Sequence, residues 1–193
     1  MRREVLEVVL PAAALVALDA GEGEEDFIGD FEPARRIDHA FQFGGINALP
    51  LFLVLDHPDL FEAYPGLADV MVQIMKDPLA SASYREMECR TKVIRLTRST
   101  QMQTLLHEIQ HGIQSIEGFA QGGTVGMFNL PHAQAVDCYV RLAGEVEARD
   151  VERRQHLDAA ARRQREPACS PGPGSEDLLL VMHEGDVPRA RCV

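Results

Sequence analysis

Two histidines and a glutamate near the middle of the chain form the pattern with the clearest chemistry. The stretch TLLHEIQHGIQ contains His107, Glu108 and His111 in an H-E-x-x-H arrangement. Residues four apart on a helix project from the same side, so the two imidazoles can bind one metal ion. Glu108 projects about 100° away from His107 and can reach a water on that ion without binding the ion itself. The pattern predicts a zinc hydrolase site in which zinc lowers the pKa of water and Glu108 accepts its proton.

A catalytic zinc usually has three protein ligands, so a third ligand is required. The later stretch LAGEVEAR offers Glu145 and Glu147, two residues apart on an expected helix and so pointing to different sides. The apolar residues of that helix cluster in one direction, which includes Glu147, whereas Glu145 falls nearly opposite. A carboxylate on an apolar stripe is costly unless it is paired or metal-bound, so helical phase favours Glu147. Glu145 is then the alternative ligand, or a partner that hydrogen-bonds to a ligand. The residues that define the apolar direction are Val136, Val140, Ala143 and Val151.

The same HEIQH stretch also has the features of an ordinary amphipathic helix. Thr100 and Gln103 form a T-x-x-Q capping box at its expected start, and Gly118 is placed to end it. In this alternative interpretation the histidines and the glutamate lie on the solvent side of the helix. The apolar stripe at helical spacing consists of Leu105, Leu106, Ile109, Ile113 and Ile116.

Two strands and a second helix are expected around this segment. Alternating, β-branched residues predict strands over residues 69–75 and 91–97, while residues 76–90 receive no assignment. One helical pattern runs from about residue 132 to 154 and includes both candidate glutamates. Residues 177–182, DLLLVM, suit a last strand or an extended docking segment. These elements predict an α+β fold, in which a small sheet packs on the HEIQH helix and a second helix carries the third ligand.

Other polar residues have simpler expected roles. In HPDLFEAYPGL, a short helix is expected to end at Pro65, and His57 is expected to cap a turn rather than bind metal. Tyr139 is expected in the core, although it lies close enough in sequence to assist an oxyanion. Cys138 is expected to be a buried, inert thiol. The arginines between Arg149 and Arg165 are interleaved with acids, which favours a solvated helix face.

Composition excludes several classes of protein. The chain has 193 residues, of which 46% are hydrophobic and 25% charged, as in ordinary globular domains. No apolar run approaches the roughly 20 residues of a membrane span, so no membrane association is expected. The net charge is −11, and seven acids lie between Asp19 and Glu32, so there is no strong nucleic-acid signal. The four cysteines form no C-x-x-C pair, which favours a reducing compartment.

The ends of the chain differ from its middle. The first residues are basic and then apolar, as in a secretion signal, but Glu4, Glu7 and Pro11 interrupt the apolar run, so secretion is not expected. Residues 1–32 are interpreted as an N-terminal extension with an acidic linker. Residues 33–156 are interpreted as one domain that contains the metal site. Residues 157–193, which include PACSPGPGS, are interpreted as a flexible C-terminal tail.

Several of these segments resemble a known group of enzymes. TLLHEIQHGIQSIEGFAQGG and YVRLAGEVEARDVERR resemble the gluzincin type of zinc metallopeptidase. More narrowly, they resemble the zincin-like domain of large polyvalent proteins from phages and integrative mobile elements. VLDHPDLFEAYPGLADV resembles the segment that precedes the catalytic helix of that domain. The likeness covers about residues 50–155.

The resemblance implies a zincin-like fold and zinc-dependent hydrolysis of a peptide or protein substrate. His107 and His111 would be zinc ligands, Glu108 the general base, and a glutamate of GEVEAR the third ligand. An E-x-x-A-x interpretation of that motif favours Glu145, in conflict with the phase argument for Glu147. A strand such as 91–97 is expected to pair with the substrate.

The resemblance also suggests a role without catalysis. In the domains that this chain resembles, the zincin-like unit is usually part of a much longer chain. This unit could be a structural or interaction module of a mobile-element polyvalent protein, in which the zinc site serves stability or binding. In either case a bacterial cytoplasmic location is expected, with delivery alongside mobile-element DNA as a variant.

Overall fold

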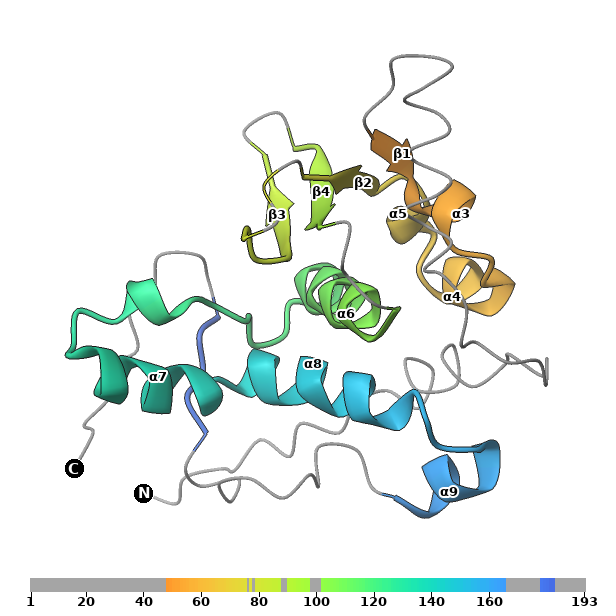
Figure 1. Ribbon diagram of the computed structural model, residues 1–193. Coiled ribbons are helices and arrows are strands. Elements are labelled where there is room, and N and C mark those ends of the chain that lie inside the picture. Colours follow the sequence, from red (N-terminus) through yellow and green to blue (C-terminus); the bar gives the residue numbers. More distant parts are fainter. Residues whose placement is uncertain are drawn as a thin grey trace.

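The computed structural model describes residues 48–75, 77, 79–87, 90–97, 102–165 and 178–182, which form an α+β fold (Figure 1). The expected α+β class is confirmed, whereas the expectations for residues 1–47 and for capping by Thr100 lie outside the described residues. No helix in this part of the chain combines the length and the apolar character that crossing a membrane requires. In chain order the elements are β1 (Ala48–Pro50), α3 (Leu51–Val54), α4 (Pro58–Ala63), α5 (Pro65–Ala68), β2 (Met71–Ile74), β3 (Ser83–Glu86), β4 (Lys92–Leu96), α6 (Met102–Glu117), η1 (Val125–Met127), α7 (His132–Val140), α8 (Ala143–Arg154) and α9 (Ala159–Gln164).

The sheet has four strands in the order β1-β2-β4-β3. β2 and β4 lie within the two strands predicted from the sequence, and they run parallel with Val72 opposite Ile94. β1 and β3 pair antiparallel with them at the two edges. The β-branched residues of the central strands favour an extended backbone, and Val72, Ile94 and Leu96 are fully buried.

β3 lies in the connection for which no strand was predicted. In its sequence, SYRE, Tyr84 is the one residue with a large apolar group, and apolar and polar residues do not alternate. The pattern therefore does not predict a strand. β3 occupies one side of β4 and β2 occupies the other. The prediction that residues 91–97 pair with a substrate is therefore wrong, because β4 has no free edge. β3, like β1, is an edge strand, so no other described strand adjoins its outer edge.

The two short helices before β2 begin with prolines. Pro58 and Pro65 occupy the first positions of α4 and α5. At that position a backbone amide has no acceptor within the helix, so its absence in proline costs no helical hydrogen bond. Pro65 was expected to end a helix, and it both follows the end of α4 and starts α5. The Nδ1 atom of His57 accepts a hydrogen bond from the Leu60 amide at 3.2 Å, which confirms that His57 caps a turn.

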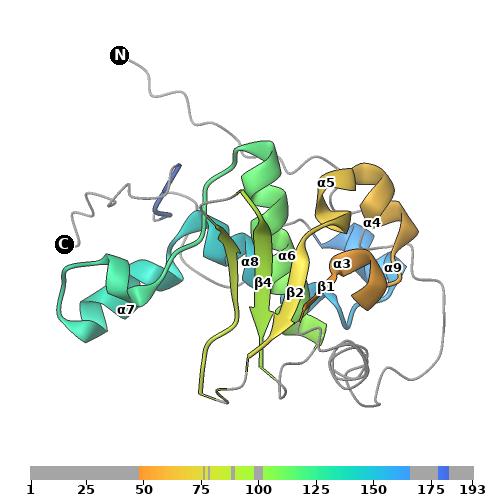
Figure 2. The same ribbon diagram turned by 90° about the horizontal axis from the view of Figure 1, so that it is seen from above.

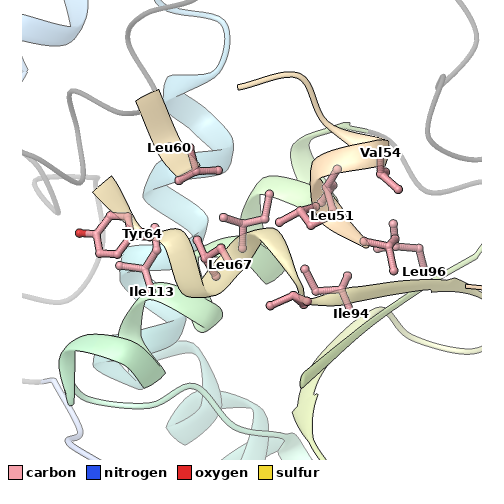
Figure 3. Packing of buried hydrophobic residues seen from close by; sticks show 12 residues of the cluster. Leu51, Val54, Leu60, Tyr64, Leu67, Ile94, Leu96 and Ile113 are labelled. Carbon is pink, nitrogen blue, oxygen red and sulfur yellow. The ribbon is translucent and has the colours of Figure 1, made fainter. Parts of the chain in front are cut away.

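The larger core lies between the sheet and the helices α3 to α6. Figure 3 shows Leu67 of α5 among Leu51, Tyr64 and Ile113. The hydroxyl of Tyr64 points out of this cluster and donates to Glu117 Oε1 at 2.6 Å. The buried members of this core are Leu51, Val54, Leu60, Tyr64, Leu67, Val70, Val72, Ile94, Leu96, Leu105, Ile109 and Ile113.

Helix α6 lies between the sheet and α8, as Figures 1 and 2 show. Its apolar stripe packs into the larger core, although Ile116 at the end of the predicted stripe is exposed. Its opposite side is covered by α8, which buries Gln110 and Gln114, while Glu108 is buried toward β3. The helix ends where predicted, because Gly118 has a φ of +70°, a conformation that glycine adopts without strain.

The region predicted as one helix from 132 to 154 forms two helices. Leu142, between α7 and α8, has an extended backbone with a ψ of 126°. The Ala143 amide donates to Leu179 O at 2.9 Å, and the Leu179 amide donates to Arg141 O at 2.8 Å. The break is thus made by a distant part of the chain, which a helical pattern read over residues 132–154 does not include.

A smaller core joins η1, α7, the start of α8 and residues 178–182, here called the C-terminal segment. Val181 of this segment is buried with Phe128, Ala135, Cys138 and Leu142. Residue 179 forms an isolated parallel bridge with Leu142. The described part of residues 177–182 is therefore an extended docking segment, one of the two alternatives expected from the sequence.

Part of the region interpreted as a C-terminal tail is folded onto α8. Asp158 accepts a hydrogen bond from the Ala161 amide and caps α9. Arg154, expected on a solvated face, is instead buried and donates to the carbonyls of Arg165 at 2.8 Å and Arg162 at 3.0 Å. The folded unit therefore continues beyond residue 156 to residue 165.

Candidate metal centre

The two histidines of α6 converge on the side that faces α8. Their Nε2 atoms lie 3.1 Å apart, and the rings meet edge to face at 80°. The side chains of His107 and His111 are only 13% and 14% exposed. Since these polar residues are mostly covered by α8, the alternative of a helix with a solvated polar side does not describe α6.

Glu145, in the first turn of α8, completes the group. Its Oε2 lies 3.5 Å from His107 Nε2, and its Oε1 lies 3.4 Å from His111 Nε2. The same carboxylate accepts hydrogen bonds from the Gly123 amide at 3.0 Å and from the Tyr139 hydroxyl at 2.7 Å. Its side chain is 2% exposed. These bonds fix the carboxylate with one oxygen toward each histidine.

The spacing of this group would accommodate one metal ion. With bonds of about 2.0–2.2 Å, a tetrahedral zinc places its ligand atoms about 3.3–3.6 Å apart. The corresponding separations here are 3.1 Å between the imidazole nitrogens and 3.4 and 3.5 Å to the carboxylate. One ligand atom from each of His107, His111 and Glu145 can be chosen so that all lie within 4.8 Å of one another. We call these three residues the metal centre.

Glu147, the residue favoured by helical phase, lies elsewhere. Its carboxylate accepts a hydrogen bond from Gln114 Nε2 at 2.5 Å, and the group that the structure brings together contains Glu145 instead. The phase argument for Glu147 took its reference direction partly from Val136 and Val140, which belong to α7. The chain leaves the helical path at Leu142, so residues of α7 cannot define the direction of side chains on α8. Within α8 the buried side passes through Gly144 and Ala148, which lie between the directions of Glu147 and Glu145, so both glutamates are buried and helical phase does not choose between them. The E-x-x-A-x interpretation, which favoured Glu145, agrees with the geometry.

Each histidine ring is held from behind by a residue that the sequence interpretation did not single out. His111 Nδ1 donates to Gln114 Oε1 at 2.9 Å, and Gln114 Nε2 in turn donates to Gly144 O at 2.9 Å. His107 Nδ1 lies 3.4 Å from Glu152 Oε1. The Gln114 bond selects the tautomer of His111 with a free Nε2, and a carboxylate behind a ring, as at His107, raises the basicity of a ligand. Two spacings could have signalled these partners: Gln114 follows His111 by three residues, and Glu152 follows Glu145 by two helical turns.

Glu108, the predicted general base, faces the sheet side of the metal centre. It is 4% exposed, and its carboxylate accepts a hydrogen bond from the backbone amide of Tyr84 in β3. Burial raises the pKa of Glu108 to about 7, against the charge of His107 and the Tyr84 amide, which lower it. A carboxyl group with such a pKa can accept and release a proton near neutral pH.

Opposite charges hold the metal centre together in the absence of an ion. Burial lowers the pKa of His107, but Glu145 and Glu152 raise it more strongly, to about 9. Burial raises the pKa of Glu145, but His107, His111, Gly123 and Tyr139 together bring it down to about 2. Burial also holds the pKa of His111 below its ordinary value. At neutral pH a protonated His107 thus lies beside a carboxylate, and a cation that binds here displaces that proton.

A glycine-containing loop, residues 118–124, closes over the metal centre. A Cβ atom on Gly122 would lie 2.6 Å from Glu145 Oε1 and would also collide with the His111 ring. A Cβ atom on Gly144 would lie 2.5 Å from the backbone nitrogen of Gly122. The loop, the start of α8 and the metal ligands therefore approach more closely than any larger residue at 122 or 144 allows.

Two further residues near the site, Tyr139 and Cys138, can be compared with their expected roles. Tyr139 was expected in the core, and its half-buried ring packs against the smaller core, 5.8 Å from the Arg149 guanidinium carbon, while its hydroxyl donates to Glu145. Burial and the charge of Glu145 raise the pKa of Tyr139, so it stays a hydrogen-bond donor. Cys138 is buried, as predicted.

Comparison of the chain with protein-family models, with curated proteins and with solved structures finds no match.

Proposed function

We propose that this chain is a zinc-dependent peptidase with a zincin-like fold, and that His107, His111 and Glu145 bind the ion. The observation that carries the proposal is the convergence of two imidazole nitrogens and one carboxylate at separations of 3.1–3.5 Å. Two histidines and a glutamate form the donor set of several catalytic zinc sites, in which the fourth position stays open. The resemblance of the HEIQH and GEVEAR segments to zincin-like domains points to the same chemistry.

The residues around the metal centre suit hydrolysis. A zinc ion in this site supplies a Lewis acid that polarises a carbonyl and lowers the pKa of water. Glu108 supplies the carboxylate that accepts the proton of the attacking water and passes it to the leaving amine. The Tyr84 amide fixes that carboxylate, and burial brings its pKa to about 7.

We infer that the substrate is a peptide bound in extended form along β3. The Tyr84 amide donates to Glu108, so it cannot also donate to β4 and must face the outer edge of β3. The general base therefore lies next to that edge. An extended peptide can add to an exposed strand edge through backbone hydrogen bonds, whatever its side chains.

The test is zinc content and proteolysis of the full chain, with two single variants. We expect the wild type to contain one zinc ion per chain and to cleave an unstructured protein such as casein. His107→Ala should lose both zinc and cleavage. Glu108→Gln should keep zinc and lose cleavage, because the amide cannot accept the proton.

The outcomes separate the two functions considered. A pure wild-type protein that binds no zinc would refute the proposed metal centre. Zinc binding without cleavage in the wild type, together with a Glu108→Gln variant of equal affinity, would favour the non-catalytic module. Cleavage that persists in Glu108→Gln would exclude Glu108 as the general base.

A further inference from the structure

The hydrogen bonds at the α7–α8 junction explain why the helix breaks there. In a continuous helix the Ala143 amide would donate to the carbonyl of residue 139, and the Arg141 carbonyl would accept from the amide of residue 145. Both groups bond to Leu179 instead, at 2.9 and 2.8 Å. The C-terminal segment thus takes the place of two helical hydrogen bonds, which a single extended residue can do by pairing as in a sheet.

The break determines the direction of Glu145. The first hydrogen bond of α8 runs from the Val146 amide to the Leu142 carbonyl at 2.9 Å, so the helical phase is set anew at Leu142. Glu145 is in the first turn after this point, two residues beyond Ala143. Its carboxylate direction therefore depends on the junction more directly than that of any residue further along α8.

The C-terminal segment also holds the loop that covers Glu145. The Gln121 amide donates to Val181 O at 2.6 Å. Gln121 directly precedes Gly122, which packs against the metal ligands, and Gly123, whose amide donates to Glu145 Oε1. Glu145 thus lies between two stretches of backbone, and the C-terminal segment is bonded to both.

Side chains anchor the segment on one side only. Val181 is 2% exposed within the smaller core, whereas Leu180 is 57% exposed. This alternation is that of an extended strand with one face buried. Val181 is therefore the residue whose removal should release the segment, and Leu180 offers a control one residue away.

We propose that the C-terminal segment, residues 178–182, is a positioning element of the metal centre, which sets the phase of α8 so that Glu145 faces His107 and His111. The inference rests on the proposed zinc site. The segment contributes no atom to the group of His107, His111 and Glu145, and it acts on that group through Glu145. Anything that displaces it, such as a partner that pairs with the same backbone groups, lowers zinc affinity without touching a ligand.

The test compares Val181→Asp with Leu180→Asp in the full chain. Val181→Asp should weaken zinc binding about 10–100-fold, the loss typical of residues that orient metal ligands. Leu180→Asp adds the same charge to the same segment and should leave the affinity unchanged. With cobalt(II) in place of zinc, the visible spectrum of Val181→Asp should change, because the carboxylate leaves the coordination sphere.

A double-mutant cycle separates this role from general destabilisation. If Val181 acts through Glu145, Val181→Asp should add little further loss of affinity to Glu145→Gln. It should add its full effect to Glu152→Gln, which acts on His107. Equal additivity in both backgrounds would overturn the proposal.

Cys138 provides a direct probe of the segment. It is buried in the smaller core with Val181, so release of the segment should expose its thiol to a chromogenic disulfide reagent, in a background of Cys89→Ser, Cys169→Ser and Cys192→Ser. A reactive Cys138 with wild-type zinc affinity would overturn the proposal.

If Val181→Asp fails to fold, Val181→Ala and Val181→Ile replace it, and the alanine variant should lose zinc affinity while the isoleucine variant keeps it. A wild type without zinc affinity would refute the proposed function and this inference together, whereas unchanged affinity in a variant with a released segment would refute the inference only.

Discussion

Helix α6 carries His107 and His111, and its own apolar stripe holds it in a core of twelve described buried residues. Helix α8 carries Glu145 and, by contrast, begins at a junction that is held by the C-terminal segment. The half of the site that α6 provides, here called the histidine half, relies on apolar residues that recur every three or four positions. The half that α8 provides is called the glutamate half. The glutamate half relies on hydrogen bonds of residues 121 and 143 to residues 181 and 179, which are far away in sequence. The two halves meet at separations of 3.4 and 3.5 Å between imidazole and carboxylate.

The difference indicates how the site can fail. Loss of packing under α6 removes the fold as a whole, because the same residues build the larger core. Loss of packing around the C-terminal segment leaves that core intact and disturbs one ligand. Metal affinity and global stability should therefore respond to different residues, and four measurements test this.

The largest effect is expected from exchange of the ligand glutamate. Glu145→Gln should weaken zinc binding more than about 100-fold, since even residues that only hydrogen-bond to ligands cost 10–100-fold. Glu147→Gln, on the same helix and also buried, should cost much less, because Glu147 reaches His111 only through Gln114. Competition with a chromogenic chelator measures both affinities. An equal loss in the two variants would mean that either glutamate can serve as ligand.

The next effect concerns the stability of the histidine half. Ile109→Ala should lower the free energy of unfolding by about 2–5 kcal/mol, as expected for a large buried aliphatic side chain. The fraction that stays folded should retain zinc affinity, in contrast to Val181→Asp. Urea unfolding followed by circular dichroism measures the first quantity, and zinc titration in the absence of urea measures the second. A folded Ile109→Ala protein that binds zinc poorly would show that the halves are not independent.

A smaller effect is expected from the residues behind the rings. Glu152→Gln and Gln114→Ala should each weaken zinc binding about 10–100-fold, because each frees one imidazole to rotate. Glu62→Gln, an exposed acid on α4, provides a control for the loss of one charge. Affinity that is unchanged in both variants would show that packing alone orients the histidines.

The smallest effect is the pH dependence of stability without metal. The folded-state pKa of His107 is about 9, above its ordinary value of 6.5, so its contribution is complete below pH 6.5 and is lost as the pH rises through 9. Burial raises the pKa of Glu108 from 4.5 to about 7. Protonated Glu108 therefore contributes to stability below pH 4.5, and this contribution is lost as the pH rises from 4.5 to 7. These two terms have the same sign, whereas the pKa of His111 is lowered by burial, so the deprotonation of His111 stabilises the fold as the pH rises to 6.5. Above pH 6.5 the first two terms remain, and we expect stability to fall by about 1 kcal/mol or more from pH 6.5 to pH 9, since one pKa unit corresponds to about 1.4 kcal/mol. Urea unfolding in chelator, with His107→Gln and Glu108→Gln for comparison, tests which group titrates in which range.

The sequence determined the parts of this protein that depend on short-range patterns. The spacing of His107 and His111, the apolar stripe beneath them, the stop at Gly118 and the two central strands could all be predicted. Each depends on a local signal, either a helical or strand repeat or a single glycine, and each signal lies within one stretch of fewer than 20 residues. The edge strand β3 could not be predicted in this way, because SYRE carries no hydrophobic alternation and owes its extended form to pairing with β4.

Only the tertiary structure decided which glutamate joins the histidines. Both Glu145 and Glu147 are buried, so burial alone does not distinguish them. The direction of side chains on α8 cannot be carried over from α7, because the helix is interrupted at Leu142, where the Leu179 amide donates to Arg141 O and the Ala143 amide donates to Leu179 O. A backbone pairing between residues more than 30 positions apart leaves no periodic trace in the sequence around either partner. The HEIQH pattern therefore predicted where a metal could bind, and the fold around Leu142 decided how the site is completed.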